Sequence, residues 1–197
     1  MFFRILLSGI LLLSIFPAPS IAEDDDVLTT VEEAVKQYTA GDFAAAASNL
    51  DYASQLVRQK RSEITKRLLP KALPGWQAGE PESQTVASGV LGGGVTVSRE
   101  YTKGPATITI EIVSDSPVLQ SVLMMINNPL FAGAGGGKLE RVNTQRAVVK
   151  YDGDDKSGEL FIVVNNQFLV TVSGKAVERR DLLDYAGALD YFALSQN

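Results

Sequence analysis

The stretch VTVSREYTKGPATITIEI, residues 95–112, decides the fold because apolar and polar residues alternate on both sides of a short turn. The residues on one side of this alternation are Val95, Val97, Arg99, Tyr101, Ile108, Ile110 and Ile112. A period of two is the pattern of a strand with one buried face. Lys103-Gly104-Pro105 contains the residues that reverse a chain. We therefore predict an antiparallel hairpin with one apolar face.

Further strands are predicted on both sides of this hairpin. Residues 85–91 form a weaker candidate before it, and residues 146–151, 159–164 and 168–173 follow it. Asn165-Asn166 predicts a tight turn between the last two strands. Because hairpins dominate, we expect a mainly antiparallel sheet.

Two helices are predicted within this part of the chain. Pro117 opens the first, which carries Met124 and Met125 and ends at Asn127-Asn128-Pro129. The second covers residues 179–194. Its apolar side is formed by Leu182, Tyr185, Ala186, Leu189, Phe192 and Ala193. We expect both helices to pack on the sheet, which gives an α+β domain.

The N-terminal region has a helical period instead. Residues 27–39 predict one helix, with a capping box from Thr30 to Glu33 or from Thr29 to Glu32. Gly41-Asp42 then stops that helix and starts a second one, which runs from Phe43 to Leu69 before Pro70. These two helices predict an αα-hairpin.

The predicted organisation is a signal peptide over 1–22, the helical hairpin over 23–69, a linker over 70–83 and the α+β domain over 84–197. The linker is rich in proline and glycine. We expect its Trp76, the only tryptophan of the chain, to fix it onto a neighbouring element.

Several resemblances accompany this organisation. Residues 41–53, with Gly41, Phe43 and the run of alanines, resemble part of one tetratricopeptide (TPR) repeat, a family in which such residues let two helices pack closely. The element order of 84–197 resembles that of the photosystem extrinsic PsbP proteins and the nuclear-transport factor Mog1, which implies a PsbP/Mog1-like fold without catalysis. The whole chain is similar in style to uncharacterised exported proteins of Gram-negative bacteria.

The first residues predict export. Arg4 precedes an apolar run over 5–16, Pro17 and Pro19 follow, and Ser20-Ile21-Ala22 places small residues at a cleavage site. The run is shorter than the roughly 20 residues of a membrane-spanning helix. We expect cleavage after Ala22 and a soluble periplasmic or secreted protein; the alternative is an uncleaved N-terminal anchor. No cysteine stands near the cut, so lipoprotein processing is excluded.

The composition excludes several classes of function. The chain contains no cysteine and no histidine, so it offers no thiolate nucleophile, no imidazole base and no His/Cys zinc site. Its formal net charge of −5 is unlike that of a nucleic-acid-binding domain. We therefore expect no enzyme, no cofactor and no nucleic-acid partner.

The second helix carries a group of cations that we expect to meet a protein partner or an anionic membrane surface. These residues are Arg58, Lys60, Arg61, Lys66, Arg67 and Lys71. An ordinary solvated helix end, where cations suit the helix dipole, is the alternative.

Two loops resemble ligand sites. Gly133, Gly135, Gly136 and Gly137 precede Lys138, but a phosphate-binding loop needs Ser or Thr at 139 and a preceding strand, so we expect a mobile loop. Residues 152–159 are acidic and partly match a calcium loop, but Lys156 occupies a ligand position. We expect a polar hairpin turn there, with weak calcium binding as the alternative.

These observations favour a non-catalytic binding or adaptor protein of the cell envelope that acts through protein contacts. One alternative is a carrier of a small ligand or lipid, with a pocket between the sheet and the Met124/Met125 helix and a gate over 132–137. The other is an enzyme that uses Glu100 and Glu111 as acid and base.

Overall fold

The alternating stretch forms the predicted hairpin. In the computed structural model, β3 (Gly94–Lys103) and β4 (Ala106–Ser114) pair antiparallel, and Gly104 takes a positive φ of 58° in the turn between them. The structure describes residues 25–86, 94–114, 118–128, 130, 133 and 136–197. The predicted signal peptide, most of the 85–91 candidate strand, Pro117 and Gly135 lie outside these residues.

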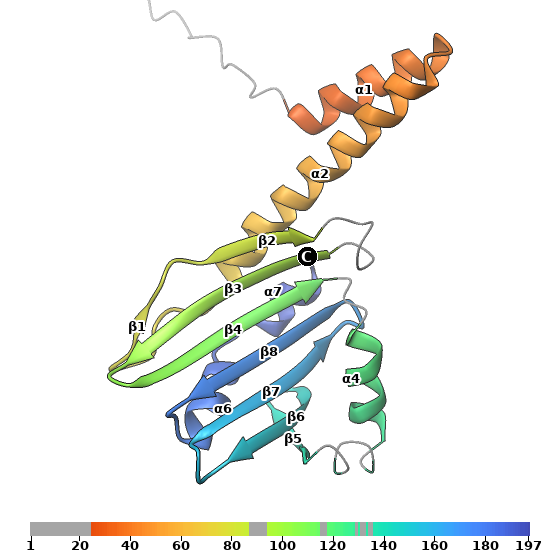
Figure 1. The fold of residues 1–197 in the computed structure, drawn as a ribbon. Coiled ribbons are helices and arrows are strands. Elements are labelled where there is room, and N and C mark those ends of the chain that lie inside the picture. Colours follow the sequence, from red (N-terminus) through yellow and green to blue (C-terminus); the bar gives the residue numbers. More distant parts are fainter. Residues whose placement is uncertain (1–24, 87–93, 115–117, 129, 131–132, 134–135) are drawn as a thin grey trace, which may run out of the picture.

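The sheet has eight strands, and the pairings between them are antiparallel. Its order is β1-β3-β4-β8-β7-β6-β5, with β2 paired to β3 (Figure 1). The remaining strands are β1 (Gln77–Ala78), β2 (Glu82–Val86), β5 (Lys138–Val142), β6 (Gln145–Asp152), β7 (Ser157–Val164) and β8 (Phe168–Lys175). The three strands predicted after residue 145 are confirmed, as is the turn between β7 and β8, where Asn165 and Asn166 both have positive φ.

Two strands were not predicted. β1 and the start of β2 lie within 70–83, so part of the segment expected as a linker is paired to the edge of the sheet through β3. β5 follows the glycine-rich segment directly and forms the opposite edge. Trp76 is buried and packs edge-on against Tyr185, with ring centres 5.3 Å apart, as expected for a residue that fixes this segment.

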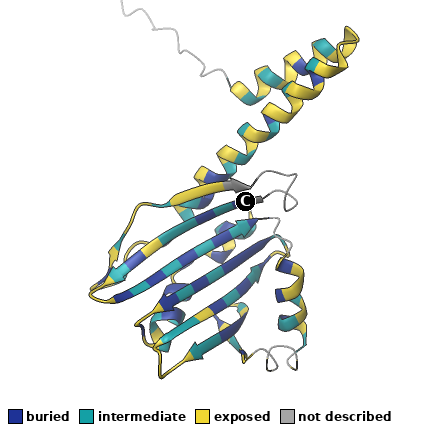
Figure 2. Cartoon of the chain, in the orientation of Figure 1, coloured by how far each residue is buried: buried dark blue, intermediate teal, exposed yellow. Residues whose placement is uncertain are grey.

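Helices cover the sheet on both faces (Figure 1). The inner face packs against α6 (Arg179–Gly187), α7 (Tyr191–Ser195) and the C-terminal end of α2, and it carries the main apolar core (Figure 2). The outer face carries α4 (Val118–Asn127), whose Leu119, Val122 and Ile126 pack on Val148 and Leu169.

The prediction of a single terminal helix over 179–194 is wrong, because the helix is interrupted between α6 and α7. Asp190 caps α7 by accepting a hydrogen bond from the backbone N–H of Ala193 at 2.9 Å. This interruption directs Tyr191 and Leu194 into the core and leaves Phe192 exposed. The predicted continuous helix had placed Phe192 on its buried side.

Two opposed glycines let α6 approach the sheet closely. Gly158 and Gly174 are direct partners in the pairing of β7 and β8. A Cβ on Gly158 would lie 3.0 Å from Leu182 of α6 and 2.5 Å from the Lys150 carbonyl oxygen of β6, and a Cβ on Gly174 would lie 2.9 Å from Leu182. Side chains at these positions would therefore push the helix off the sheet.

The N-terminal helical hairpin is confirmed. α1 (Asp26–Thr39) and α2 (Phe43–Leu68) contact each other along the length of α1, and the pair projects away from the sheet (Figure 1). Neither predicted capping box starts α1; the side chain of Asp25 caps it instead by accepting from Val27 N–H. Among the described residues, no helix combines the length and hydropathy needed to cross a membrane.

Candidate functional site

We call α1 together with residues 43–57 of α2 the arm. The seam between its two helices is thin, because the side chains buried in it are those of Ala34, Ala46 and Ala53. Polar contacts supplement this seam. Asn49 donates a hydrogen bond to Gln37 at 2.9 Å, and Lys60 donates to Asp25 at 2.8 Å. The hydrogen bond from Lys60 holds the pKa of Asp25 below its ordinary value.

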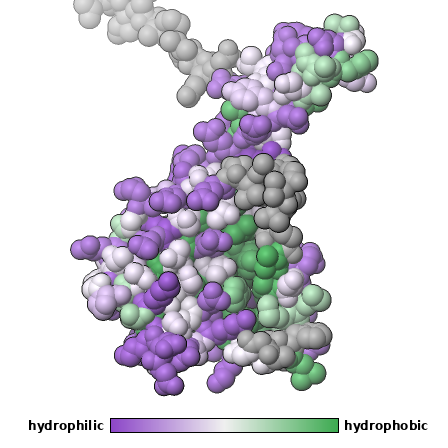
Figure 3. Space-filling model, in the orientation of Figure 1, coloured by the Kyte–Doolittle hydropathy of each residue, from purple (hydrophilic) through white to green (hydrophobic). Residues whose placement is uncertain are grey.

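The arm leaves large apolar side chains exposed. On α1 they are Leu28, Val31, Val35 and Tyr38, and on α2 they are Phe43, Leu50 and Val57. Tyr38 is 64% exposed and Phe43 is 63% exposed, although apolar residues of such size usually turn inward. Figure 3 shows hydrophobic side chains gathered near the free end of the arm.

These residues share one side of the arm. Gln37 and Asn49 face each other across the seam. Tyr38 is the residue after Gln37, and Leu50 is the residue after Asn49. One residue turns a helix by about 100°. Because the two helices run in opposite directions, this turn carries both side chains to the same side. The edge-on contact of Tyr38 with Phe43, with ring centres 5.4 Å apart, joins the two stripes at the tip. We call these seven residues the free face.

The predicted group of cations is not brought together on one open surface. Lys60 pairs with Asp25, and Lys66 pairs with Glu63 at 2.8 Å. Arg61 lies between α2 and the sheet, with its guanidinium 4.8 Å from the centre of the Phe168 ring.

The other cations are spread along the base of α2. Lys60 and Arg67 line a cleft of about 560 Å³ that also contains Asp25, Asp26 and Glu63. Arg58 is half-buried and Lys71 is exposed beyond the end of the helix. The acids around this group reduce its cationic character.

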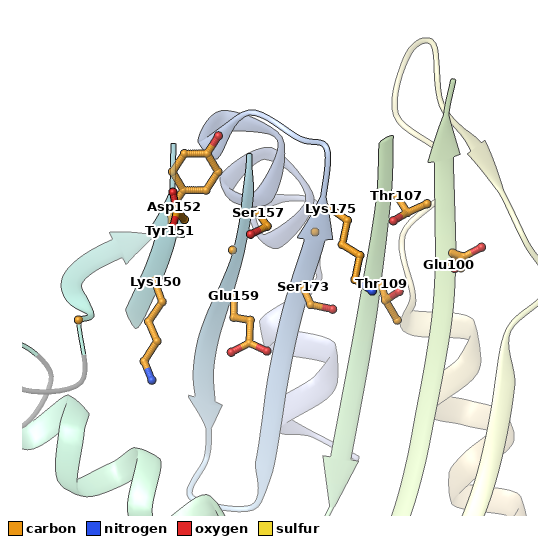
Figure 4. Close-up of a pocket in the computed structure, with 13 residues that line it drawn as sticks. Glu100, Thr107, Thr109, Lys150, Tyr151, Asp152, Ser157, Glu159, Ser173 and Lys175 are labelled. Carbon is orange, nitrogen blue, oxygen red and sulfur yellow. The ribbon is translucent and has the colours of Figure 1, made fainter. Parts of the chain in front are cut away.

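A second candidate is a groove of about 560 Å³ on the outer face of the sheet, beside α4. One cross-strand row supplies its centre, and this row consists of Glu100, Thr109, Ser173, Glu159 and Lys150. Thr107, Lys175, Ser157 and Asp152 extend the groove along the strands. Figure 4 shows these side chains standing side by side on their strands. The groove offers hydroxyl groups and charges of both signs for hydrogen bonds.

The two acids considered for catalysis lie on the same outer face, as the alternation predicted. Glu100 pairs with Thr109 and lines the groove, whereas Glu111 pairs with Ser98 in the next row toward α4. They are diagonal neighbours in the sheet, a relation that places Cα atoms about 7–8 Å apart.

The acidic loop that resembled a calcium site forms a turn. Asp152 accepts hydrogen bonds from the backbone N–H groups of Asp154 and Asp155, and Lys156 pairs with Glu178. The expected hairpin turn between β6 and β7 is thus confirmed, and the described residues contain no cluster of three or more acids that could hold a metal ion. In the glycine segment, Gly136 N–H donates to the Gly133 carbonyl at 3.0 Å, Gly136 lines the groove, and Gly137 is buried. The predicted mobility of Gly133, Gly136 and Gly137 stays a prediction.

Packed side chains occupy the position where a pocket between sheet and helix was expected. The residues of α4 that face the sheet contact Val148 and Leu169, and Met125 packs beside them while Met124 is exposed. The groove lies next to this contact and has a polar lining, so any ligand it held would be polar. Comparison with models of protein families, with curated proteins and with solved structures finds none that matches this chain.

Proposed function

We propose that the chain is a non-catalytic binding or adaptor protein of the cell envelope whose arm makes the protein contact. The observation that carries this proposal is the free face. Seven apolar side chains gather there on one side of a projecting helical hairpin. Contiguous exposed apolar surface of this kind marks interaction sites in proteins.

The size of the free face supports a protein partner. The 14 residues of α1 span about 21 Å, and two packed helices are about 20 Å wide. The projected area is therefore on the order of 400 Å², and the accessible area of its side chains is larger. Leaving this surface in water costs about 25 cal/mol per Å², which favours its burial against another apolar surface.

The proposal also includes export of the chain and a PsbP/Mog1-like fold for residues 84–197. Export rests on the signal-peptide pattern of residues 1–22, with cleavage after Ala22. The PsbP/Mog1-like assignment rests on element order. Its implied lack of catalysis agrees with the absence of cysteine and histidine from the chain.

Site-specific photocrosslinking in cells tests the proposal. A photoreactive amino acid replaces Leu50 on the free face or, as a matched control, Tyr52, which is also exposed on α2 but faces another side. We expect a discrete crosslinked protein band from position 50 and none from position 52. Equal results at the two positions would contradict the proposal.

A second candidate function, binding of a small polar ligand, is favoured by the groove on the outer face. Its row of Thr109, Ser173 and Glu159 presents hydrogen-bonding groups in a fixed register. Native mass spectrometry of the protein purified from its host tests this function. We expect a bound metabolite that Ser173→Arg removes; a ligand-free spectrum in both forms would refute it.

A further inference from the structure

We propose that the partner of the free face is a second copy of this chain, and that two arms pack antiparallel about a two-fold axis into a four-helix bundle. This inference rests on the proposed function and names its partner. Shape, charge and area support it independently.

The first argument is self-complementary shape. Along α2, large and small residues alternate with spacings of four and three: Phe43, Ala47, Leu50, Ser54 and Val57. The stripe on α1 has spacings of three, four and three: Leu28, Val31, Val35 and Tyr38. Such spacings are those of a helical seam in which side chains of one helix fill the gaps of another. With a two-fold axis near Leu50, the small residues Ala47 and Ser54 on either side of Leu50 leave room for the Leu50 side chain of the other copy.

The second argument is the distribution of charge along the arm. The tip half, residues 32–51, contains four acids and one lysine: Glu32, Glu33, Asp42, Asp51 and Lys36. Arg58 follows directly at the base end of the arm, beyond which Lys60 and Lys66 pair with acids and Arg61 packs over Phe168. Antiparallel packing centred on Leu50 places Asp42 of one copy near Arg58 of the other, since each lies eight residues from Leu50. Parallel packing would oppose like charges.

The third argument is area. Two copies that bury the free face remove on the order of 1,000 Å² from water, which reaches the lower bound of specific interfaces. An interface of this size gives an equilibrium between monomer and dimer that depends on concentration.

The charge of the tip disfavours a membrane as the occupant. Asp42 at the turn and Asp51 beside Leu50 would approach an anionic lipid surface together with the apolar side chains. The other possible occupant of the free face is a different envelope protein. The experiments below distinguish it from a second copy of this chain.

Sedimentation velocity on the chain expressed from Met1 tests self-association. We expect the particle mass to double as the protein concentration rises through the micromolar range. Leu50→Asp should weaken association at least tenfold, and the control Tyr52→Asp should leave it unchanged. Circular dichroism checks that both variants stay folded.

Single cysteines test the antiparallel arrangement in a chain that has none of its own. Leu50 lies midway between Phe43 and Val57, so Leu50→Cys should sit near the two-fold axis and form a disulfide-linked dimer. Ala40→Cys at the tip should not, because the two tips point apart. Efficient linkage through Ala40→Cys instead would overturn the arrangement.

The outcomes separate this inference from the function on which it rests. A chain that is monomeric at every concentration, yet crosslinks from position 50 to another protein in cells, overturns the second copy and leaves the adaptor function standing. A monomer without any crosslink overturns both. Flotation with vesicles containing phosphatidylglycerol that Leu50→Asp abolishes would also overturn the second copy.

Discussion

The inner face of the sheet and the arm use apolar residues in opposite ways. On the inner face, Tyr101, Ile108 and Ile110 are 0% exposed, and α6 and α7 pack over that face of the sheet. On the arm, the buried residues are three alanines, and the large side chains face outward. The sheet therefore contains its own packing partner within the chain, whereas the arm presents a surface that its own domain leaves uncovered.

Stability and function therefore reside in different parts of the molecule. Burial of large side chains contributes about 1.5–3 kcal/mol each, so the sheet accounts for most of the free energy of folding. Packing through alanine contributes much less per residue. Changes in the sheet should therefore alter folding, and changes on the free face should alter binding.

The largest effect is expected at Gly158, where both β6 and α6 lie close to the backbone. Gly158→Ala places a Cβ 2.5 Å from the Lys150 carbonyl oxygen, a backbone atom that cannot move freely. We expect a loss of about 3 kcal/mol in the free energy of unfolding, measured by urea denaturation. Gly153→Ala, where the nearest atom would be 3.9 Å away, is the control and should cost less than about 0.5 kcal/mol. Equal losses would contradict the close packing around Gly158.

Alkaline pH should destabilise the sheet next. Burial raises the pKa of Tyr101, Tyr185 and Tyr191 above the ordinary value. Above pH 10 the unfolded chain releases these protons while the folded chain keeps them, so stability present below pH 10 is lost as pH rises. The slope is up to about 1.4 kcal/mol per pH unit for each tyrosine. Thermal unfolding between pH 8 and 11 measures it; a melting temperature that does not fall would contradict the burial.

Loss of one buried hydrogen bond should have a smaller effect. The Tyr101 hydroxyl donates to the Pro70 carbonyl at 2.7 Å and ties the end of α2 to the sheet. Tyr101→Phe should reduce the free energy of unfolding by about 1 kcal/mol. Tyr38→Phe on the exposed arm is the matched control. A similar loss of unfolding free energy in both variants would contradict a stabilising role of the hydrogen bond from Tyr101 to Pro70.

The smallest effect on folding is expected on the free face. Leu50→Asp replaces a side chain that is 52% exposed, so the monomer should change by less than about 0.5 kcal/mol. Chemical denaturation at a protein concentration below that of dimerisation measures this change. A loss above 2 kcal/mol would show that Leu50 is part of the internal packing of the chain.

Much of the fold was predictable because its elements have regular periods. The alternation of residues 95–112 gave one hairpin, and Asn165-Asn166 marked another. β1 has two residues and β5 has only Leu139 and Val142 as apolar residues, so neither shows a clear period. The break before α7 depends on Asp190 as a cap inside an otherwise continuous apolar stripe.

The candidate site was less predictable. The helical periods of α1 and α2 did not identify the free face, since a period alone does not say which stripe is covered. The sequence signal that could have identified the free face is the presence of two apolar stripes on α2. Ala46 and Ala53 form one stripe, and Phe43, Leu50 and Val57 form the other. Arg61, which interrupts the apolar pattern of α2, was assigned to a surface but packs over Phe168.

Hydrogen–deuterium exchange of the chain at low and high protein concentration tests the contrast between sheet and arm most directly. We expect slow exchange of β4 and β8 at both concentrations. We expect fast exchange of α1 and of residues 43–57 in dilute solution, with protection that rises as the arms associate. An arm as protected as the sheet in dilute solution, or one whose exchange does not change with concentration, would contradict the difference between sheet and arm.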